Sequence, residues 1–484
     1  MDLDREERHS AGTASAAIAY AAMIAGAVAL FLLFRHYGEA VVWPPGSTSF
    51  PTGSQSSYAS AGARGVAASA SSDLVWHLLL ALTAVVIVGQ CLGRLFRLIG
   101  QPPVIGETIA GILIGPSLLG RVAPHAFLYI LPPAVAPVLG VVAQLGVILY
   151  MFIVGLELNP DLLRGQLRTT VATAHASIAL PFVLGSGLAL YLYPRFSTSE
   201  VPFTHFALFL GVAMSITAFP VLARILADRG MTKTSLGVLA LSCAAIDDVT
   251  AWCLLAFVVG VVHAAGGSAI AVVILTASFI AVMFLAVRPA FEWWVRASDR
   301  VEPTRGAVTL TLTLLLISAL TTEAIGVHAI FGAFLLGAAI PHDSALARSL
   351  TRSLETPVTI LLLPAFFAYT GMRTQIGLVS GLYEWSICAL IVLAATVGKF
   401  GGAVAGARAS GLSWRRAASL GILMNTRGLM ELIVLNVGLD LGVISPTLFT
   451  MLVLMALATT MATTPLLQWL SPTESRPLPV AAQS

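Results

Sequence analysis

The stretch that decides the fold is residues 235–262, SLGVLALSCAAIDDVTAWCLLAFVVGVV. Its 28 residues exceed the roughly 20 that a helix needs to cross a bilayer, and its only charged side chains are the adjacent acids Asp247 and Asp248. A charged group near the bilayer centre costs about 3 kcal/mol or more, so it usually marks an ion path or a proton relay. The stretch therefore predicts a membrane-spanning helix with an ion-handling site near its middle.

The composition of the whole chain agrees with this prediction. Of 484 residues, 57% are hydrophobic and 10% are charged, against about 25% charged in a typical soluble domain, and the mean hydropathy is +0.91. Such a chain lacks the polar residues that cover a water-soluble globule. A soluble enzyme, a disordered protein and a secreted disulfide scaffold are therefore excluded, and the continuous apolar runs exclude an outer-membrane barrel.

Fourteen apolar segments predict an all-α polytopic membrane protein with about 13 core transmembrane helices and one extra N-terminal helix. The N-terminal segment is 16–34. Two glycine pairs with i,i+4 spacing, Gly111 with Gly115 and Gly402 with Gly406, permit close helix contacts. The core helices, numbered one to thirteen, are expected near 74–96, 103–120, 133–157, 169–193, 204–226, 235–262, 269–288, 306–322, 326–341, 357–372, 382–404, 417–437 and 447–470.

These segments divide the chain into three regions. Residues 1–73 combine the N-terminal helix with a flexible Ser/Ala/Gly-rich linker, residues 74–470 form the transmembrane domain, and residues 471–484 form a short tail. We favour a retained signal-anchor helix over a cleaved signal peptide. The apolar run is long for a signal peptide, and its flank, residues 1–10, carries four acids against two arginines.

The basic residues, 24 Arg and two Lys, predict the orientation of the chain. With a cytoplasmic N-terminus, cytoplasmic loops and span ends hold 19 of them and external loops hold five, while Lys399 and Arg427 lie inside apolar segments. The positive-inside rule then predicts a multi-pass protein of the cell (inner) membrane with cytoplasmic N- and C-termini. No run rich in Lys or Arg indicates a nucleic-acid partner.

Asp247 and Asp248 are the most informative pair. Adjacent helical residues point about 100° apart, so the two carboxylates cannot face one neighbour but can border one cavity. Away from water, such groups can hold protons near neutral pH and release them when a cation arrives. We interpret the pair as a site at which a cation and protons compete, and the alternative is a pair of acids satisfied by neighbouring helices.

Lys399 lies well inside core helix eleven, in the string VGKFGG at 397–402. An ammonium group at this depth needs an acidic partner, and the nearest candidates are the two aspartates. A buried lysine also changes its protonation state readily, so it can take part in proton exchange. The alternative is a side chain that snorkels to the membrane interface.

Two core helices are expected to be interrupted. In core helix five, Pro220 removes a backbone hydrogen bond near mid-span and frees carbonyl groups around Ser215 and Thr217. In core helix twelve, the polar tetrapeptide NTRG occupies 425–428. Broken helices at the midplane place half-helix ends at a binding site, and these two helices, seven spans apart, run in opposite directions as inverted repeats require.

Arg427 and Glu431 are four residues apart on core helix twelve. They form either a pair that neutralises itself or a site at which Arg427 offsets the partial charges of the helix break. The acids nearer span ends are expected to be solvated or to cap helices: Glu107, Glu157 and Glu323.

Six motifs, spread over nearly the whole core, carry a resemblance to a known family. They are GETIAGILIGPSLLG at 106–120, MFIVGLELNPDLL at 151–163, SITAFPVLARIL at 215–226, IDDVTAW at 246–252, TEAIGVHAIFGAFLLGAAIP at 322–341 and NTRGLMEL at 425–432. Together they resemble the monovalent cation:proton antiporter-2 family, which includes Kef-type potassium transporters, bacterial sodium/proton antiporters and plant cation/H⁺ exchangers. The aspartate pair makes the plant exchanger-like and sodium/proton branches more similar than Kef.

The resemblance implies two helix bundles. Core helices four to six and eleven to thirteen would carry the ion, and helices one to three and eight to ten would form a dimer-forming scaffold along which the first bundle moves like an elevator. The implied roles are Asp248 as the principal cation ligand, Asp247 as the partner of Lys399, Thr217, Asn425 and Thr426 as helix-crossing elements, and Arg427 and Glu431 as supporting charges. Ala218 departs from family members that have an acid at this position, which leaves open how the helix ends are neutralised.

We therefore expect a secondary active transporter, and not an enzyme, that exchanges a monovalent cation (Na⁺ or K⁺) for protons by alternating access without a cofactor. Competition between cation and proton at Asp248 would make this exchange and not leak. The alternative is a gated monovalent cation channel or a Kef-type efflux system, although no carbonyl run typical of a selectivity filter is visible. The expected partners are the cation, protons, the lipid bilayer and a second copy of the chain.

Overall fold

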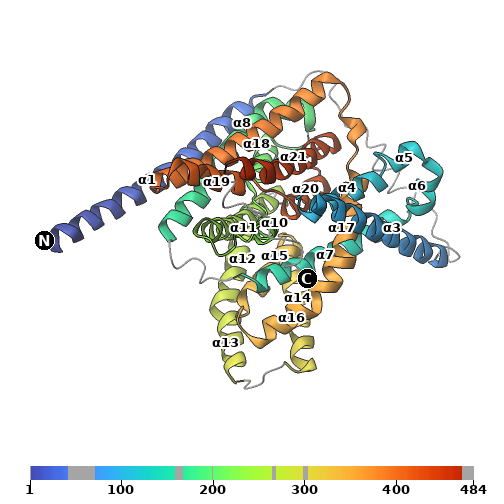
Figure 1. The fold of residues 1–484 in the computed structure, drawn as a ribbon, viewed down its shortest axis with the longest axis horizontal. Helices are drawn as coiled ribbons and strands as arrows, with labels where there is room; N and C mark the ends of the chain where they lie inside the picture. Colours follow the sequence, from blue (N-terminus) through green and yellow to red (C-terminus); the bar gives the residue numbers. More distant parts are fainter. Residues whose placement is uncertain are drawn as a thin grey trace.

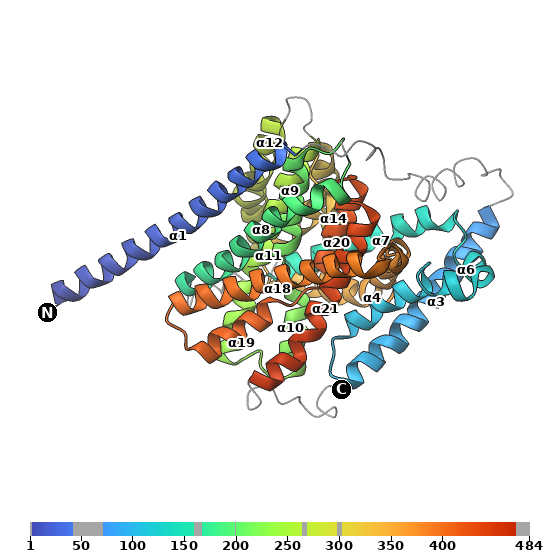
Figure 2. The ribbon, with the colours of Figure 1, turned by 90° about the horizontal axis from the view of Figure 1, so that it is seen from above.

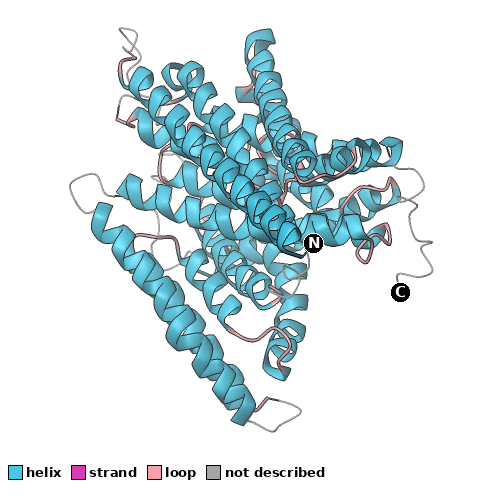
Figure 3. Cartoon of the chain, turned by 90° about the vertical axis from the view of Figure 1, so that its left-hand side faces the viewer, coloured by secondary structure: helices cyan, strands magenta, loops and turns pink. Residues whose placement is uncertain are grey.

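The computed structural model describes residues 2–41, 71–158, 167–198, 200–263, 269–297 and 303–470. These residues form helices joined by turns and loops, with no strand among them (Figure 3). The prediction of an all-α protein is therefore confirmed. Most of the expected linker, from residue 42 to residue 70, and the tail 471–484 lie outside the described residues.

The helices follow the apolar segments closely, with ends that differ by several residues. The first half of the chain contains α1 (Asp2–Glu39), α3 (Ser71–Leu98), α4 (Pro103–Ile114), α5 (Leu119–Val122), α6 (Pro124–Ile130), α7 (Val135–Leu156), α8 (Leu167–Phe196), α9 (Phe203–Ser215), α10 (Phe219–Asp228) and α11 (Ser235–His263). The second half contains α12 (Ala269–Val282), η2 (Met283–Val287), α13 (Arg288–Ala297), α14 (Arg305–Ile325), α15 (Ala329–Ala339), α16 (Ala345–Pro357), η3 (Val358–Leu362), α17 (Leu363–Arg373), η4 (Ile376–Leu378), α18 (Gly381–Ala409), α19 (Trp414–Met424), α20 (Leu429–Asp440) and α21 (Pro446–Leu470).

The number of membrane spans depends on how interrupted helices are counted. Among the described residues, 11 helices are long and apolar enough to cross a membrane, or up to 12 when the bent pair α19 and α20 forms one span. The two remaining expected segments contain shorter helices, α9 followed by α10 and the 11-residue α15. Each of the 14 apolar segments therefore contains helix, and a count by length alone is lower because broken and short helices do not reach the required length.

The core helices pack into two bundles. The first bundle is α8–α11 with α18–α21, and its most extensive contact is between α8 and α18. The second bundle is α3, α4, α7, α14, α15 and α17, in which α7 packs on α15 and α3 packs on α4. In Figure 1, α8, α18, α19 and α21 lie together in the upper half, and α7, α14 and α16 lie below them.

Glycines allow both bundles to pack closely, as the glycine pairs predict. A Cβ atom at Gly402 of α18 would lie 2.3 Å from the backbone oxygen of Ala176 in α8. A Cβ atom at Gly111 of α4 would lie 2.1 Å from the backbone oxygen of Phe367 in α17. Between lipid tails there is little hydrophobic gain from helix association, so this close backbone contact is a main source of attraction between the helices.

The extra N-terminal helix is present and packs on the first bundle. The ring of Phe31 in α1 lies 5.8 Å from that of Phe182 in α8, and the ring of Tyr20 lies 5.4 Å from that of His175. Figure 2 shows α1 alongside α8, with its N-terminal end projecting well beyond the other helices.

Gly402→Ala should destabilise the protein, because the new methyl group meets backbone atoms of α8 that cannot move independently. We expect a loss of about 1–3 kcal/mol, measured as a lower melting temperature in detergent. Gly401→Ala is the matched control: its Cβ atom would approach the Leu180 side chain at 3.4 Å, so the usual gain from replacing a helical glycine should dominate. Equal melting temperatures for the two variants would contradict the close α8–α18 contact.

Candidate cation- and proton-binding site

Two interrupted helices form the centre of the first bundle. The break between α9 and α10 covers residues 216–218, where Ile216 and Ala218 are extended with ψ values of 136° and 94°. Pro220 lies in the first turn of α10, where a helix has no use for the missing N–H, so the break precedes the proline. The break between α19 and α20 covers residues 425–428, and the two half-helices bend by 47°.

The two breaks cross and hydrogen-bond to each other. The hydroxyl of Thr217 donates to the carbonyl of Met424 at 2.9 Å. The backbone N–H of Ala218 donates to the carbonyl of Thr426 at 3.0 Å. The structure therefore brings together Thr217 and the polar tetrapeptide that begins at Asn425, although they are about 200 residues apart in the sequence.

Two cationic side chains cap the end of α9. The guanidinium of Arg427 donates to the carbonyl of Ala213 at 3.1 Å and to the carbonyl of Met214 at 2.6 Å, and the ammonium of Lys399 donates to the carbonyl of Ser215. These carbonyls are left without helical partners by the break and carry the negative end of the helix dipole. At this end of the crossing, the side chains of Arg427 and Lys399 neutralise the negative end of the α9 dipole, although position 218 holds Ala218 and not an acid.

These two cationic side chains each pair with a buried acid in the same region. Lys399 Nζ lies 2.5 Å from Asp247 Oδ2, and Arg427 Nη1 lies 2.5 Å from Glu431 Oε2. All four side chains are fully buried. A buried ion pair needs further hydrogen bonds for its other atoms, and here the α9 carbonyls accept from both bases, whereas one oxygen of each acid has no partner among the described residues. Both interpretations of Arg427 therefore hold, because it pairs with Glu431 and also caps the helix break.

Asp248 is the fifth buried charge and differs from the others. Its side chain is 3% exposed, and neither carboxylate oxygen accepts a side-chain hydrogen bond or an ion pair from the described residues. Asp248 is therefore a buried carboxylate with no cationic partner among the described residues.

Charge balance follows from these contacts. The five buried groups comprise three carboxylic acids and two bases, so full ionisation leaves one negative charge. In this cluster, buried oxygens without a hydrogen-bond partner among the described residues are found on Asp247, Asp248, Glu431 and Asn425. Oxygen atoms are the ligands that hard cations prefer. One monovalent cation or one proton would neutralise the cluster, and both together would overcharge it.

Sequence reasoning did not find the contribution of α21. The hydroxyl of Thr460 donates to the carbonyl of Arg427 at 2.7 Å and accepts from its backbone N–H at 2.9 Å, and Thr463 lies 3.5 Å from Thr426, oxygen to oxygen. The available signal was a pair of Thr-Thr dipeptides, 459–460 and 463–464, inside an apolar helix. These hydroxyls support the break between α19 and α20.

The acids near span ends lie away from this cluster. Glu323 accepts the backbone N–H of Ala329 at 2.8 Å, which is the capping role expected of it. Glu107 lies against Gly89 and Gly93 of α3. Glu157 lines a cavity of 460 Å³ with Glu355, and burial together with the charge of Glu355 raises the pKa of Glu157.

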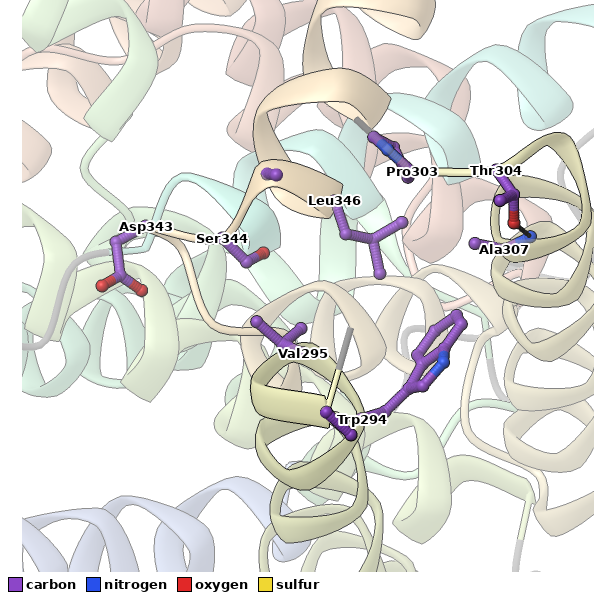
Figure 4. A pocket seen from close by; sticks show the side chains of 10 residues that line it. Trp294, Val295, Pro303, Thr304, Ala307, Asp343, Ser344 and Leu346 are labelled. Atoms are coloured by element: carbon purple, nitrogen blue, oxygen red, sulfur yellow. Dashed lines mark hydrogen bonds between the residues drawn. The ribbon is translucent and has the colours of Figure 1, made fainter. Parts of the chain in front are cut away.

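A second cavity of 730 Å³ lies between α13, α14 and α16 (Figure 4). Its lining includes Trp294, Thr304 and Ser344, and it includes none of the eight residues predicted for the ion site. The cavity in Figure 4 is therefore separate from the crossing of the broken helices.

Two packed bundles of apolar helices, with crossing broken helices and buried acids at the crossing, define a secondary transporter fold. The family model described as "Sodium/hydrogen exchanger, transmembrane" matches residues 78–470, and the chain belongs to this family.

The relatives and a solved structure agree with this assignment. The chain is 45% identical over 398 residues to the Na(+)/H(+) antiporter NhaS4 of Synechocystis, covering 80% of this chain and 96% of that one. It is 38% identical to the cation/H(+) antiporter 19 of Arabidopsis thaliana, covering 80% of this chain and 49% of the relative. The sodium proton antiporter MjNhaP1 of Methanocaldococcus jannaschii has a similar fold, with a TM-score of 0.63 at 14% identity, covering 82% of this chain and 99% of that chain.

The Lys399–Asp247 pair should be strongly coupled in stability. Lys399→Met leaves a buried carboxylate without its partner and should cost about 3–5 kcal/mol, whereas Lys399→Met combined with Asp247→Asn removes both charges and should recover most of that loss. Thermal unfolding in detergent of the wild type, both single variants and the double variant measures the coupling. Additive losses would contradict a direct buried ion pair.

Proposed function

We propose that this protein exchanges a monovalent cation, Na⁺ or K⁺, for protons across the membrane by alternating access. The observation that carries the proposal is the buried carboxylate of Asp248, which has no cationic partner among the described residues and lies at the crossing of two broken helices. Membership of the sodium/hydrogen exchanger family supports the same activity. Relatives named for Na⁺/H⁺ antiport and for cation/H⁺ antiport leave both cations open.

Competition between the cation and the proton for Asp248 produces the exchange. A low-dielectric site penalises net charge of either sign, so the cluster accepts one positive charge and rejects a second. A bound cation therefore displaces the proton, and a bound proton displaces the cation. Asp248 is the cation and proton ligand in this proposal, and the transported cation is substrate and not a resident metal.

The other site residues hold the crossing in place. Asp247 and Lys399 form one neutral pair, which positions the ammonium group on the end of α9. Arg427 and Glu431 form the second pair, which caps the same helix from the other side. Thr217, Asn425 and Thr426 supply the crossing backbone, and Asn425 adds an amide oxygen without a partner among the described residues.

The remaining parts of the proposal concern the setting of the site. Residues 74–470 form the exchanger domain, with residues 1–73 as an anchor helix and linker and 471–484 as a tail. The protein resides in the cell membrane with cytoplasmic N- and C-termini, as the distribution of basic residues favours. It acts as a transporter and not as an enzyme, and it works as a homodimer without a nucleic-acid partner.

Asp248→Asn should abolish exchange, because an amide cannot alternate between cation and proton. The measurement uses everted vesicles from cells that lack their own antiporters: a pH gradient is established, and Na⁺, K⁺ or Li⁺ is added in turn. The wild type should collapse the gradient with its substrate ion. Asp228→Asn, which changes an aspartate paired with Arg224 at the surface end of α10, is the matched control and should remain active.

Normal exchange by an inserted Asp248→Asn protein would contradict the assignment of Asp248. No collapse with any ion between about pH 6.5 and 9, by wild-type protein shown to be inserted, would contradict the exchange activity. Cation currents above the turnover of a transporter would favour the gated channel.

A further inference from the structure

A cluster of polar side chains joins the two bundles at the end of α17. Arg373 donates to Asn436 Oδ1 at 3.0 Å and forms an ion pair with Asp440. The amide of Asn436 donates in turn to the hydroxyl of Thr370 at 2.9 Å. We call these four residues, Thr370, Arg373, Asn436 and Asp440, the Arg373 clasp.

The clasp connects α20, which carries Glu431 of the buried charge cluster, to the second bundle. Arg373 and Thr370 belong to α17, which packs on α4 and α7, while Asn436 and Asp440 belong to α20. Figure 1 shows α17 and α20 next to each other. The first turn of α20 holds Glu431 of the buried charge cluster, and its last residue is Asp440. Any sliding of α20 along α17 must therefore break the clasp.

A cavity of 210 Å³ lies beside the clasp, between α7, α15, α17 and α20. Asn436 and Asp440 belong both to the clasp and to the cavity lining. Apolar side chains from all four helices also line the cavity, among them Val147, Ile330, Phe366 and Ile433, together with the polar side chains of Gln144 and His328. The cavity has room for several water molecules, and the clasp contributes two of its polar side chains.

The contact at the opposite face of the bundles is of a different kind. There, the neutral amide of Gln101 donates to the carbonyl of Met461 at 3.1 Å, and both groups are exposed. The clasp instead combines an ion pair with a side-chain amide that is only 6% exposed. A buried amide that loses its partners is costly, whereas an exposed neutral hydrogen bond is readily replaced by water. The two faces are therefore held with unequal strength.

We propose that Arg373 is a positioning residue of the exchange cycle: the Arg373 clasp holds the α17 end of the bundle boundary closed, and its release opens the 210 Å³ cavity as the cation entrance from that face. The inference rests on the proposed exchange function and adds the contact that controls access of the cation to the ion site. The ion pair is partly exposed, with 19% of the Arg373 side chain and 53% of the Asp440 side chain accessible. Such a pair is weak enough to open and close in every cycle.

The test measures access to the cavity with a single cysteine. Val147→Cys is introduced into a protein in which Cys91, Cys243, Cys253 and Cys388 have been replaced, and a membrane-impermeant thiol reagent is applied to each face in turn. Arg373→Gln should raise the labelling rate from the clasp face by roughly three- to tenfold, because loss of a hydrogen-bonded charge shifts the population toward the open state.

Arg195→Gln is the matched control. Arg195 also ends a helix, donates to the carbonyl of Tyr191 at 2.7 Å and stacks over its ring at 4.1 Å, but these contacts stay within α8. Arg373 stacks in the same way over Tyr369 at 4.8 Å and adds the contacts to α20. The control should leave labelling unchanged, and equal labelling in Arg373→Gln and wild type would overturn the proposal.

A charge-reversal experiment distinguishes an arginine that acts through its ion pair with Asp440 from one with a purely structural role. Arg373→Asp combined with Asp440→Arg should restore slow labelling, whereas each single variant should label fast. In active protein, Arg373→Gln should also change the ratio of half-saturating cation concentrations measured from the two faces. If Arg373→Gln labels fast but the wild type does not exchange ions, the proposed exchange function is refuted and the clasp is retained. If the wild type exchanges ions and Arg373→Gln labels at the wild-type rate, only the clasp is refuted.

Discussion

The arrangement of this protein depends on keeping net charge small where water is scarce. Five ionisable side chains are buried where α9, α11, α18 and α20 meet. Two ion pairs account for four of these charges, and Asp248 remains. Because an uncompensated charge is costly in this environment, the site requires one positive charge from outside the chain. A cation and a proton are equivalent in this respect, and the exchange follows from that equivalence.

The broken helices and the charge cluster depend on each other. A helix that ends inside the membrane exposes carbonyl groups that need donors, and Arg427 and Lys399 supply them to the end of α9. Those two cations in turn need counter-charges, which Glu431 and Asp247 provide. The helix breaks therefore explain why bases as well as acids lie inside the membrane span. Because the bases neutralise the end of α9, position 218 can hold the apolar residue Ala218.

The sequence predicted those residues of the site whose burial in an apolar environment is energetically costly. Buried charges stand out in an apolar chain, so Asp247, Lys399 and Arg427 could be identified, and the continuous apolar segments located the helices. Two features could not be predicted. The backbone pairing of Ala218 with Thr426 joins segments far apart in the sequence, which no local pattern marks, and the threonine hydroxyls of α21 carry no charge that would mark them. Similarly, the clasp residues resemble ordinary span-end side chains until α17 and α20 are brought together.

In the proposed exchange at a single carboxylate, cation binding and proton release are one event. The most direct measurement adds Na⁺ or K⁺ to purified protein in weakly buffered detergent solution and records the protons released per cation bound. The account predicts release on cation addition, weaker cation binding as the pH falls, and neither effect in Asp248→Asn, because protons and cations occupy the same group. Cation binding that releases no proton and does not depend on pH would contradict it.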